Sequence, residues 1–329
     1  MKLVVRAILA FSIFATLSVF YLVGISRFPD YENYLRLAKG IGFLVSEHDY
    51  LFEWLSRFIL GFSGISDTNK VELLAVLNQI VCVVFFVWIG LKSRSDRVYG
   101  ALFVFCLFGF LFMTTTLRAS SAYLCISAFF LRGARFDFPG VGLLVFSMAW
   151  HDSAVPVVFI CFVAQGLSYC TFRYRIREQV LSWILRCIVI GSGAIVLSTK
   201  LLHPLFSNLM SRLDLGVRAA YLGDGAYSLS KLLFVLFGIF ICFNFVSDTR
   251  QSLSSRLFIS LMSMVVGLSH MLSGVVSVRF AIYIFLVILP LRGIFVFEFE
   301  RKLEVRILAL MISPLVFYLS TLYVFSNTL

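Results

Sequence analysis

The sequence predicts an all-α protein that crosses a membrane many times, and its composition supports this class. Hydrophobic residues make up 60% of the 329 residues, and charged residues make up only 14%. Soluble domains usually carry roughly 25% charged residues. The apolar residues are gathered in separate runs, and a helix of about 20 apolar residues is enough to span the bilayer. A globular cytoplasmic protein is therefore excluded.

The apolar runs predict about eleven transmembrane helices. The first run, residues 5–25, follows Lys2 and Arg6 and is longer than the apolar core of a signal peptide, which has about 7–15 residues. We therefore expect it to remain as a helix. The other spans are expected near residues 71–91, 98–114, 117–131, 138–150, 154–168, 180–199, 231–247, 257–276, 280–297 and 307–325.

Two stretches, about 26–70 and 200–230, are too polar to span and are expected to be long outer loops. Within the first, residues 50–62 are amphipathic and place Glu53 and Arg57 one turn apart, which favours an interfacial or re-entrant helix. The chain shows no internal repeat and no low-complexity tract. We therefore expect one membrane domain over residues 1–329.

Basic residues predict the orientation, because Lys and Arg are retained on the cytoplasmic side. A cytoplasmic N-terminus places the runs KSRSDR (92–97) and FRYRIR (172–177) inside, together with Arg132 and Arg135. A helix break at His151 is needed for this, since one continuous helix over 138–168 would put FRYRIR outside. The net charge of +11 then faces anionic lipid head groups, and no nucleic-acid partner is expected.

Polar residues that interrupt the apolar runs collect on the outer side in this layout. They are Arg118 at the start of the fourth helix, His151 and Asp152 between the fifth and sixth, Arg218 and Tyr221 in the second outer loop, His270 about two turns inside the ninth, and Arg279 at the start of the tenth. Charged groups at such depth usually pair or face a cavity. Three arginines around one outer cavity would suit phosphate or pyrophosphate.

Each of these residues also has a structural interpretation. The arginines could extend to the head groups, His151 and Asp152 could cap the following helix, and His270 could be a hydrogen-bonded interior histidine. The seven cysteines are scattered without a CxxC pair, so no metal centre or disulfide framework is expected. An acidic triplet at Asp30 and Glu32 leaves open a Mg²⁺ or Mn²⁺ site in the first outer loop.

LRASSAY (117–123), the basic turn at Arg132 and Arg135, and WHDSA (150–154) occur in that order. This block resembles the centre of the EpsG-like branch of the Wzy-type polysaccharide polymerases. The resemblance extends to Tyr31 and Tyr34 after the first helix, to Glu53, to Arg218 with Tyr221, and to Arg279 with Tyr283.

The resemblance implies a GT-C-like membrane glycosyltransferase without a cofactor, in the bacterial inner membrane and with its active site on the periplasmic face. Its donor and acceptor would be glycans linked to undecaprenyl pyrophosphate, and its partners would be membrane lipid and a chain-length regulator. It implies pyrophosphate binding by Arg118, Arg218 and Arg279, and a catalytic pair of His151 and Asp152. Substrate contacts would come from Tyr31, Tyr34, Glu53, Tyr221, His270 and Tyr283.

Other functions stay open at this point. A flippase or transporter of lipid-linked sugars would show paired broken helices in two related halves, and no such symmetry is visible in the sequence. An O-antigen ligase would share the lipid donor but use a different acceptor. A membrane-bound acyltransferase would use a histidine but leaves the arginines unexplained, and a purely structural subunit is a further alternative.

Overall fold

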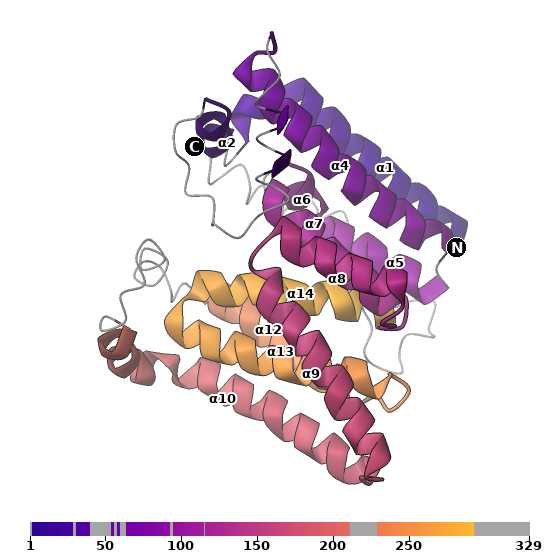
Figure 1. Ribbon diagram of the computed structural model, residues 1–329, viewed down its shortest axis with the longest axis vertical. Helices are drawn as coiled ribbons and strands as arrows, with labels where there is room; N and C mark the ends of the chain where they lie inside the picture. The colour runs from indigo at the N-terminus through magenta and orange to yellow at the C-terminus, as the bar shows by residue number, and fades with distance from the viewer. Residues whose placement is uncertain are drawn as a thin grey trace. The chain divides into compact units, whose positions relative to one another are not determined.

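The computed structural model describes residues 2–28, 31–39, 54–55, 58–59, 64–92, 95–114, 116–210 and 229–292. Within these ranges all the regular secondary structure is helical (Figure 1). Six of the described helices are long and apolar enough to cross a membrane, and four shorter apolar segments accompany them. The fold is therefore that of a helical, multi-pass membrane protein, as the composition predicted.

The helices fall into two compact units. The described residues up to Val155, with the end of α14 from Leu289, belong to unit 1, and Pro156–Ile288 form unit 2. Unit 1 contains α1 (Lys2–Val23), η1 (Ile25–Arg27), α2 (Tyr31–Ala38), α4 (Asp67–Lys92), α5 (Ser95–Val104), the π-helical η2 (Phe105–Gly109), α6 (Phe110–Thr114), α7 (Leu117–Leu131) and α8 (Phe138–Trp150). Unit 2 holds most of α9 (Ala154–Arg173) and α14 (Gly274–Arg292), and all of α10 (Glu178–Met210), α12 (Leu229–Ser247) and α13 (Leu253–Leu272).

The predicted break at His151 is confirmed, because α8 ends at Trp150 and α9 begins at Ala154. Helices also occupy parts of the two stretches expected as outer loops. Helix α2 lies inside the expected loop 26–70, and α10 continues to Met210, since a fall in hydropathy ends a membrane span without ending helical hydrogen bonding. The expected span 307–325 and most of the segment 50–62 lie outside the described residues.

The break between α13 and α14 falls at Ser273, whereas the sequence analysis placed it after residue 276. Ser273 has an extended backbone, and its hydroxyl accepts a hydrogen bond from the Val275 N–H at 3.2 Å. This is the geometry of an N-cap, which serine favours. The cap therefore starts α14 at Gly274, five residues before Arg279.

In unit 1, α7 and α8 form an antiparallel hairpin (Figure 1). The turn between them is held by Asp137, whose Oδ1 accepts from the Gly140 N–H at 2.9 Å and whose Oδ2 lies 2.9 Å from Arg132 Nη2. A Cβ on Gly140 would lie 1.9 Å from the Arg135 carbonyl oxygen, so only glycine fits there. Further along, Ser147 Oγ donates to the Ala122 carbonyl at 3.1 Å and marks the register of the pair.

Acid is expected to weaken this turn. The Gly140 N–H, and then Arg132, hold the pKa of Asp137 below its ordinary value. Because the folded pKa is depressed, the stabilisation is present above the ordinary aspartate pKa and is lost as pH falls through the folded pKa. Asp137→Ala removes the cap at every pH. The difference in melting temperature between wild type and this variant should be largest near about pH 6 and smallest near about pH 2. A difference that stays constant with pH would show that the charge of Asp137 does not stabilise the turn.

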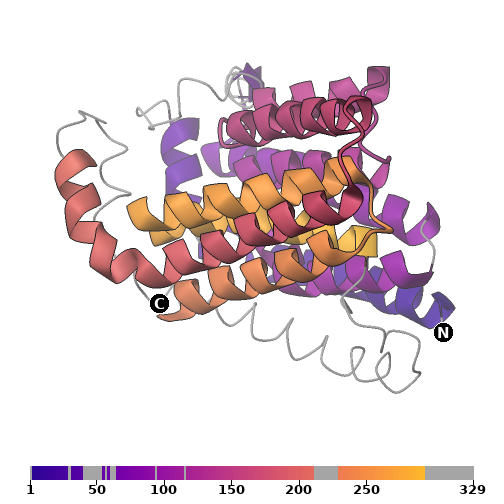
Figure 2. The same ribbon diagram turned by 90° about the horizontal axis from the view of Figure 1, so that it is seen from below.

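In unit 2, α10, α12 and α13 lie side by side with similar axis directions (Figures 1 and 2). Small residues allow α10 and α13 to approach closely, as is common between membrane helices. The hydroxyls of Ser192 and Ser263 are 3.3 Å apart, and a Cβ on Gly267 would lie 3.1 Å from the Ser192 carbonyl oxygen. Helix α14 contacts α12 where the Phe285 ring covers Gly238.

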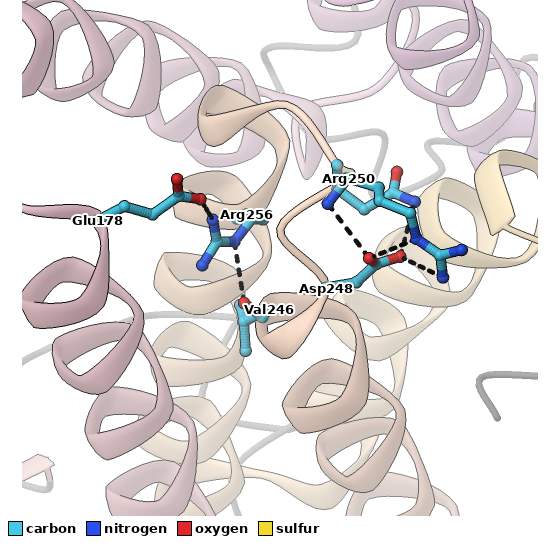
Figure 3. Close-up of polar contacts among 6 residues, drawn as sticks. Glu178, Val246, Asp248, Arg250 and Arg256 are labelled. Atoms are coloured by element: carbon cyan, nitrogen blue, oxygen red, sulfur yellow. Dashed lines mark hydrogen bonds and ion pairs between the residues drawn. The ribbon is translucent and has the colours of Figure 1, made fainter. Parts of the chain in front are cut away.

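A buried arginine joins three helices at the opposite end of unit 2 from the α13–α14 break. Arg256, in the first turn of α13, is only 1% exposed. Its Nε donates to the Val246 carbonyl of α12 at 2.9 Å and its Nη1 to Glu178 Oε1 of α10 at 3.0 Å (Figure 3). Its Nη2 donates to the hydroxyl of Ser182. All three guanidinium nitrogens therefore have acceptors, which is the condition for burying such a group.

Candidate functional site

The helical run α5–η2–α6 stops at Thr114, and α7 begins three residues later. Such a break leaves backbone carbonyls without helical partners, and each uncovered carbonyl is costly where water is absent. Two adjacent amides on α4 cover them. Asn78 Nδ2 donates to the Phe112 carbonyl at 2.7 Å, and Gln79 Nε2 donates to the Met113 carbonyl at 3.0 Å.

The same asparagine also holds the start of α7. Its Oδ1 accepts hydrogen bonds from Ser120 Oγ at 2.7 Å and Ser121 Oγ at 2.9 Å. Asn78 is 1% exposed, so this is a buried polar joint between α4, α6 and α7. It fixes the first turn of the helix whose second residue is Arg118. The sequence analysis missed Asn78 and Gln79, although two neighbouring amides inside an apolar run were a visible signal.

His151 and Asp152 form a close pair in the break between α8 and α9. His151 is 7% exposed and takes an extended backbone, and its Nδ1 lies 3.2 Å from Asp152 Oδ1. The carboxylate is half-buried. A carboxylate at Nδ1 favours a proton on that nitrogen, which makes Nε2 the basic nitrogen of the ring. The pair is therefore arranged as an oriented histidine base would be.

The hairpin brings the backbone of Arg118 to the level of this pair. Ser147 of α8 bonds to Ala122 of α7. Arg118 lies one turn before Ala122 on α7, and His151 lies one turn after Ser147, directly at the end of α8. Because the two helices are antiparallel, these two steps lead in the same direction. Two of the residues singled out in the sequence, 33 positions apart, therefore share one end of the α7–α8 hairpin.

Tyr31 and Tyr34 also lie at this end of unit 1. Helix α4 runs parallel to α7, since Asn78 meets Ser121 and positions further along α4 line a groove with later positions of α7. The N-terminal part of α4 therefore lies at the same end as the start of α7. Helix α2 packs there, with Tyr31 Oη 3.3 Å from Thr68 Oγ1 and Tyr34 only 6% exposed.

His270, Arg279 and Tyr283 belong to unit 2, around the α13–α14 break. His270 lies in the last turn of α13 and not two turns inside it, because the helix ends at Leu272. It is 1% exposed, and its Nδ1 is 2.9 Å from Ser277 Oγ, which itself donates to the Gly274 carbonyl. A hydroxyl has one proton, so the histidine Nδ1–H donates to Ser277. This geometry fits a hydrogen-bonded interior histidine.

Arg279 lies in the second turn of α14, so its expected place at the start of that helix was wrong. Its side chain is exposed, whereas Tyr283, one turn later, is fully buried. Arg218, Tyr221, Glu53 and Asp30 lie outside the described residues. Among the residues that the structure describes, no group of three His, Cys, Asp or Glu side chains could hold a metal ion.

The fold defines the class as a helical, multi-pass membrane protein, with a buried polar joint and a histidine–aspartate pair at one end of unit 1. Comparison with protein-family models, curated proteins and solved structures finds no match for this chain. The function is therefore inferred from these residues and their geometry.

Proposed function

We propose that the chain is a membrane glycosyltransferase that polymerises oligosaccharide repeat units linked to undecaprenyl pyrophosphate, similar to the EpsG-like branch of the Wzy-type polymerases. The observation that supports this most is the shared level of Arg118 and the His151–Asp152 pair at one end of the α7–α8 hairpin. Glycosyl transfer from a lipid pyrophosphate requires a base for the acceptor hydroxyl and a cation for the leaving group, and this end of the hairpin offers both residue types.

In the proposed reaction, His151 Nε2 takes the proton of the acceptor hydroxyl as the hydroxyl oxygen attacks the anomeric carbon of the donor glycan. The bond between that carbon and the pyrophosphate oxygen breaks, and its electron pair leaves with the lipid pyrophosphate. Arg118 stabilises the charge that develops there. Asp152 holds the imidazole through Nδ1 and balances the charge of the imidazolium. Arg218 and Arg279 are further candidate cations on the grounds of the resemblance alone.

The proposal includes a location and a topology. The protein would lie in the bacterial inner membrane with about eleven spans, a GT-C-like architecture, a cytoplasmic N-terminus and the His151 end of unit 1 on the periplasmic face. The distribution of basic residues supports this orientation, because Arg132 and Arg135 lie at the opposite end of the α7–α8 hairpin from His151. Donor and acceptor would be lipid-linked glycans, and a chain-length regulator would be a partner.

Loss of polymer is the expected result of replacing either Arg118 or His151 by alanine. In a cell that lacks this protein, wild type should restore a ladder of surface glycans on a gel, whereas Arg118→Ala and His151→Ala should leave one repeat unit. An effect of about 100-fold or more on polymer yield is expected for the base. Arg177→Ala, an exposed arginine before α10, is the matched control and should retain the ladder. Immunoblots of membrane fractions would check that all variants insert.

The same gel separates the alternatives. A full ladder of surface glycans in the cell that lacks the protein would contradict the proposal that this protein is the polymerase. Lipid-linked polymer that accumulates without reaching its final acceptor indicates a ligase, and repeat units trapped on the cytoplasmic side indicate a flippase. Full polymer yield from His151→Ala would remove this histidine from the mechanism.

A further inference from the structure

An apolar groove runs along α4, α7 and α8 of unit 1 and is separate from the proposed catalytic end. It has a volume of about 460 Å³. Helix α4 contributes Val84 and Trp88, α7 contributes Leu124 and Ala128, and α8 contributes Leu143. Arg132 is the charged residue in this otherwise apolar lining, and it lies at one end. The groove is therefore apolar along its length and cationic at its mouth.

The mouth of the groove lies at the level expected for lipid head groups. Arg132 directly follows α7, and Asp137 directly precedes α8, so the chain turns here outside the apolar core. Trp88 lies one turn before the end of α4, and tryptophan is enriched at the membrane interface. From Arg132 back to Leu124, α7 rises by about 12 Å, close to the roughly 15 Å of hydrocarbon in one leaflet.

Arg132 has the capacity to bind a phosphate. Its Nη2 donates to Asp137 Oδ2 at 2.9 Å, and its side chain is 35% exposed. A guanidinium carries five N–H donors, so one bond to a carboxylate leaves donors for a second anion. Arg135 adds a further positive charge in the same turn, against the single negative charge of Asp137. The turn as a whole therefore attracts anions.

We propose that this groove binds one acyl chain of an anionic phospholipid, taken from the leaflet that borders the α7–α8 turn, with the lipid phosphate at Arg132. The apolar lining covers the acyl chain across a single leaflet. The positive charge at the mouth of the groove selects an anionic head group over a zwitterionic one. The length of the groove matches an acyl chain better than the much longer polyprenyl chain of the proposed donor. The site is independent of the proposed reaction.

Lipid binding is measured by native mass spectrometry of the full-length, detergent-purified protein. The probes are phosphatidylglycerol, phosphatidylcholine and undecaprenyl phosphate, each added at matched concentrations. Wild type should retain phosphatidylglycerol in preference to the other two. Arg132→Gln should weaken that binding by about fivefold, the effect of one basic residue near an anionic lipid. Asp137→Asn keeps a side chain that can cap α8 but removes the competing carboxylate, so it should bind phosphatidylglycerol as tightly or more tightly.

The two substitutions are expected to change phosphatidylglycerol binding in opposite directions. Because both break the Arg132–Asp137 ion pair, a loss of folding alone would weaken binding in both variants. Equal losses in Arg132→Gln and Asp137→Asn would overturn the proposal. A second test fills the groove with Ala128→Phe, which should abolish retention. Val145→Phe is its control, since Val145 is 52% exposed on α8 outside the groove. Retention that survives Ala128→Phe, equal retention of phosphatidylcholine, or a preference for undecaprenyl phosphate would each contradict an anionic phospholipid in this groove.

Discussion

Arg256→Ala is expected to destabilise the protein by about 3 kcal/mol, at the lower end of the range for breaking a buried ion pair. The substitution removes the group that joins α10, α12 and α13, and it leaves the Val246 carbonyl and the Ser182 hydroxyl without this donor. The value is at the lower end because Glu178, the charged partner, is 63% exposed and can return to water. Thermal unfolding in detergent, followed by circular dichroism, would measure the loss.

A neighbouring arginine supplies the control. Arg250 makes a comparable ion pair with Asp248, at 2.9 Å, but its side chain is 75% exposed (Figure 3). Arg250→Ala should cost less than Arg256→Ala, because Asp248, which is 8% exposed, still accepts from the backbone N–H of residue 250 and from Gln251 Nε2. Glu178→Gln should also have a small effect, and Arg256→Lys a large one, because an ammonium group cannot reach three acceptors that a planar guanidinium spans. Equal melting temperatures for Arg256→Ala and Arg250→Ala would show that burial of Arg256 is unimportant.

Asn78→Leu is expected to be the most damaging substitution in unit 1. Leucine has a similar size, so little packing is lost, but the Phe112 carbonyl loses its donor and the hydroxyls of Ser120 and Ser121 lose their acceptor. Each unsatisfied buried group costs roughly 1–3 kcal/mol, which gives a total of about 3 kcal/mol or more. The melting temperature in detergent is the measurement. Gln165→Leu, an exposed amide on α9, is the control and should be nearly neutral.

The serines allow a sharper test of this joint. Because Asn78 Oδ1 accepts two hydrogen bonds, it keeps one donor when either serine is replaced by alanine. The double variant Ser120→Ala with Ser121→Ala should therefore lose more stability than the sum of the two single variants. Additive losses would indicate that the two hydrogen bonds to Asn78 Oδ1 contribute independently of each other.

The joint also links stability to the proposed function. It holds the first turn of α7, where Arg118 is the second residue. Asn78→Leu should therefore reduce polymer yield even where the variant inserts into the membrane, and growth at lower temperature should restore part of it. Arg118→Ala should not respond to temperature, because that change removes the charge itself.

Some features could be read from the chain because they depend on neighbouring residues. The break at His151 was predictable, since a histidine and an aspartate are adjacent between two apolar runs. The end of α10 was not predictable in this way, because residues 200–210 are polar enough to leave a membrane yet remain helical. The position of the α13–α14 break was missed because Arg279 was a stronger signal in the sequence than the capping hydroxyl of Ser273.

The sequence by itself determined that this is a helical membrane protein, where its long apolar helices lie, and which polar residues interrupt them. These properties follow from local hydropathy and charge, because each segment meets water or lipid independently of its partners. Only the tertiary structure decided that Asn78 meets Ser121, 43 residues away, and that Arg256 meets Glu178, 78 residues away. Such pairs depend on how helices pack, because a buried polar group is stable only beside a partner that distant parts of the chain bring to it.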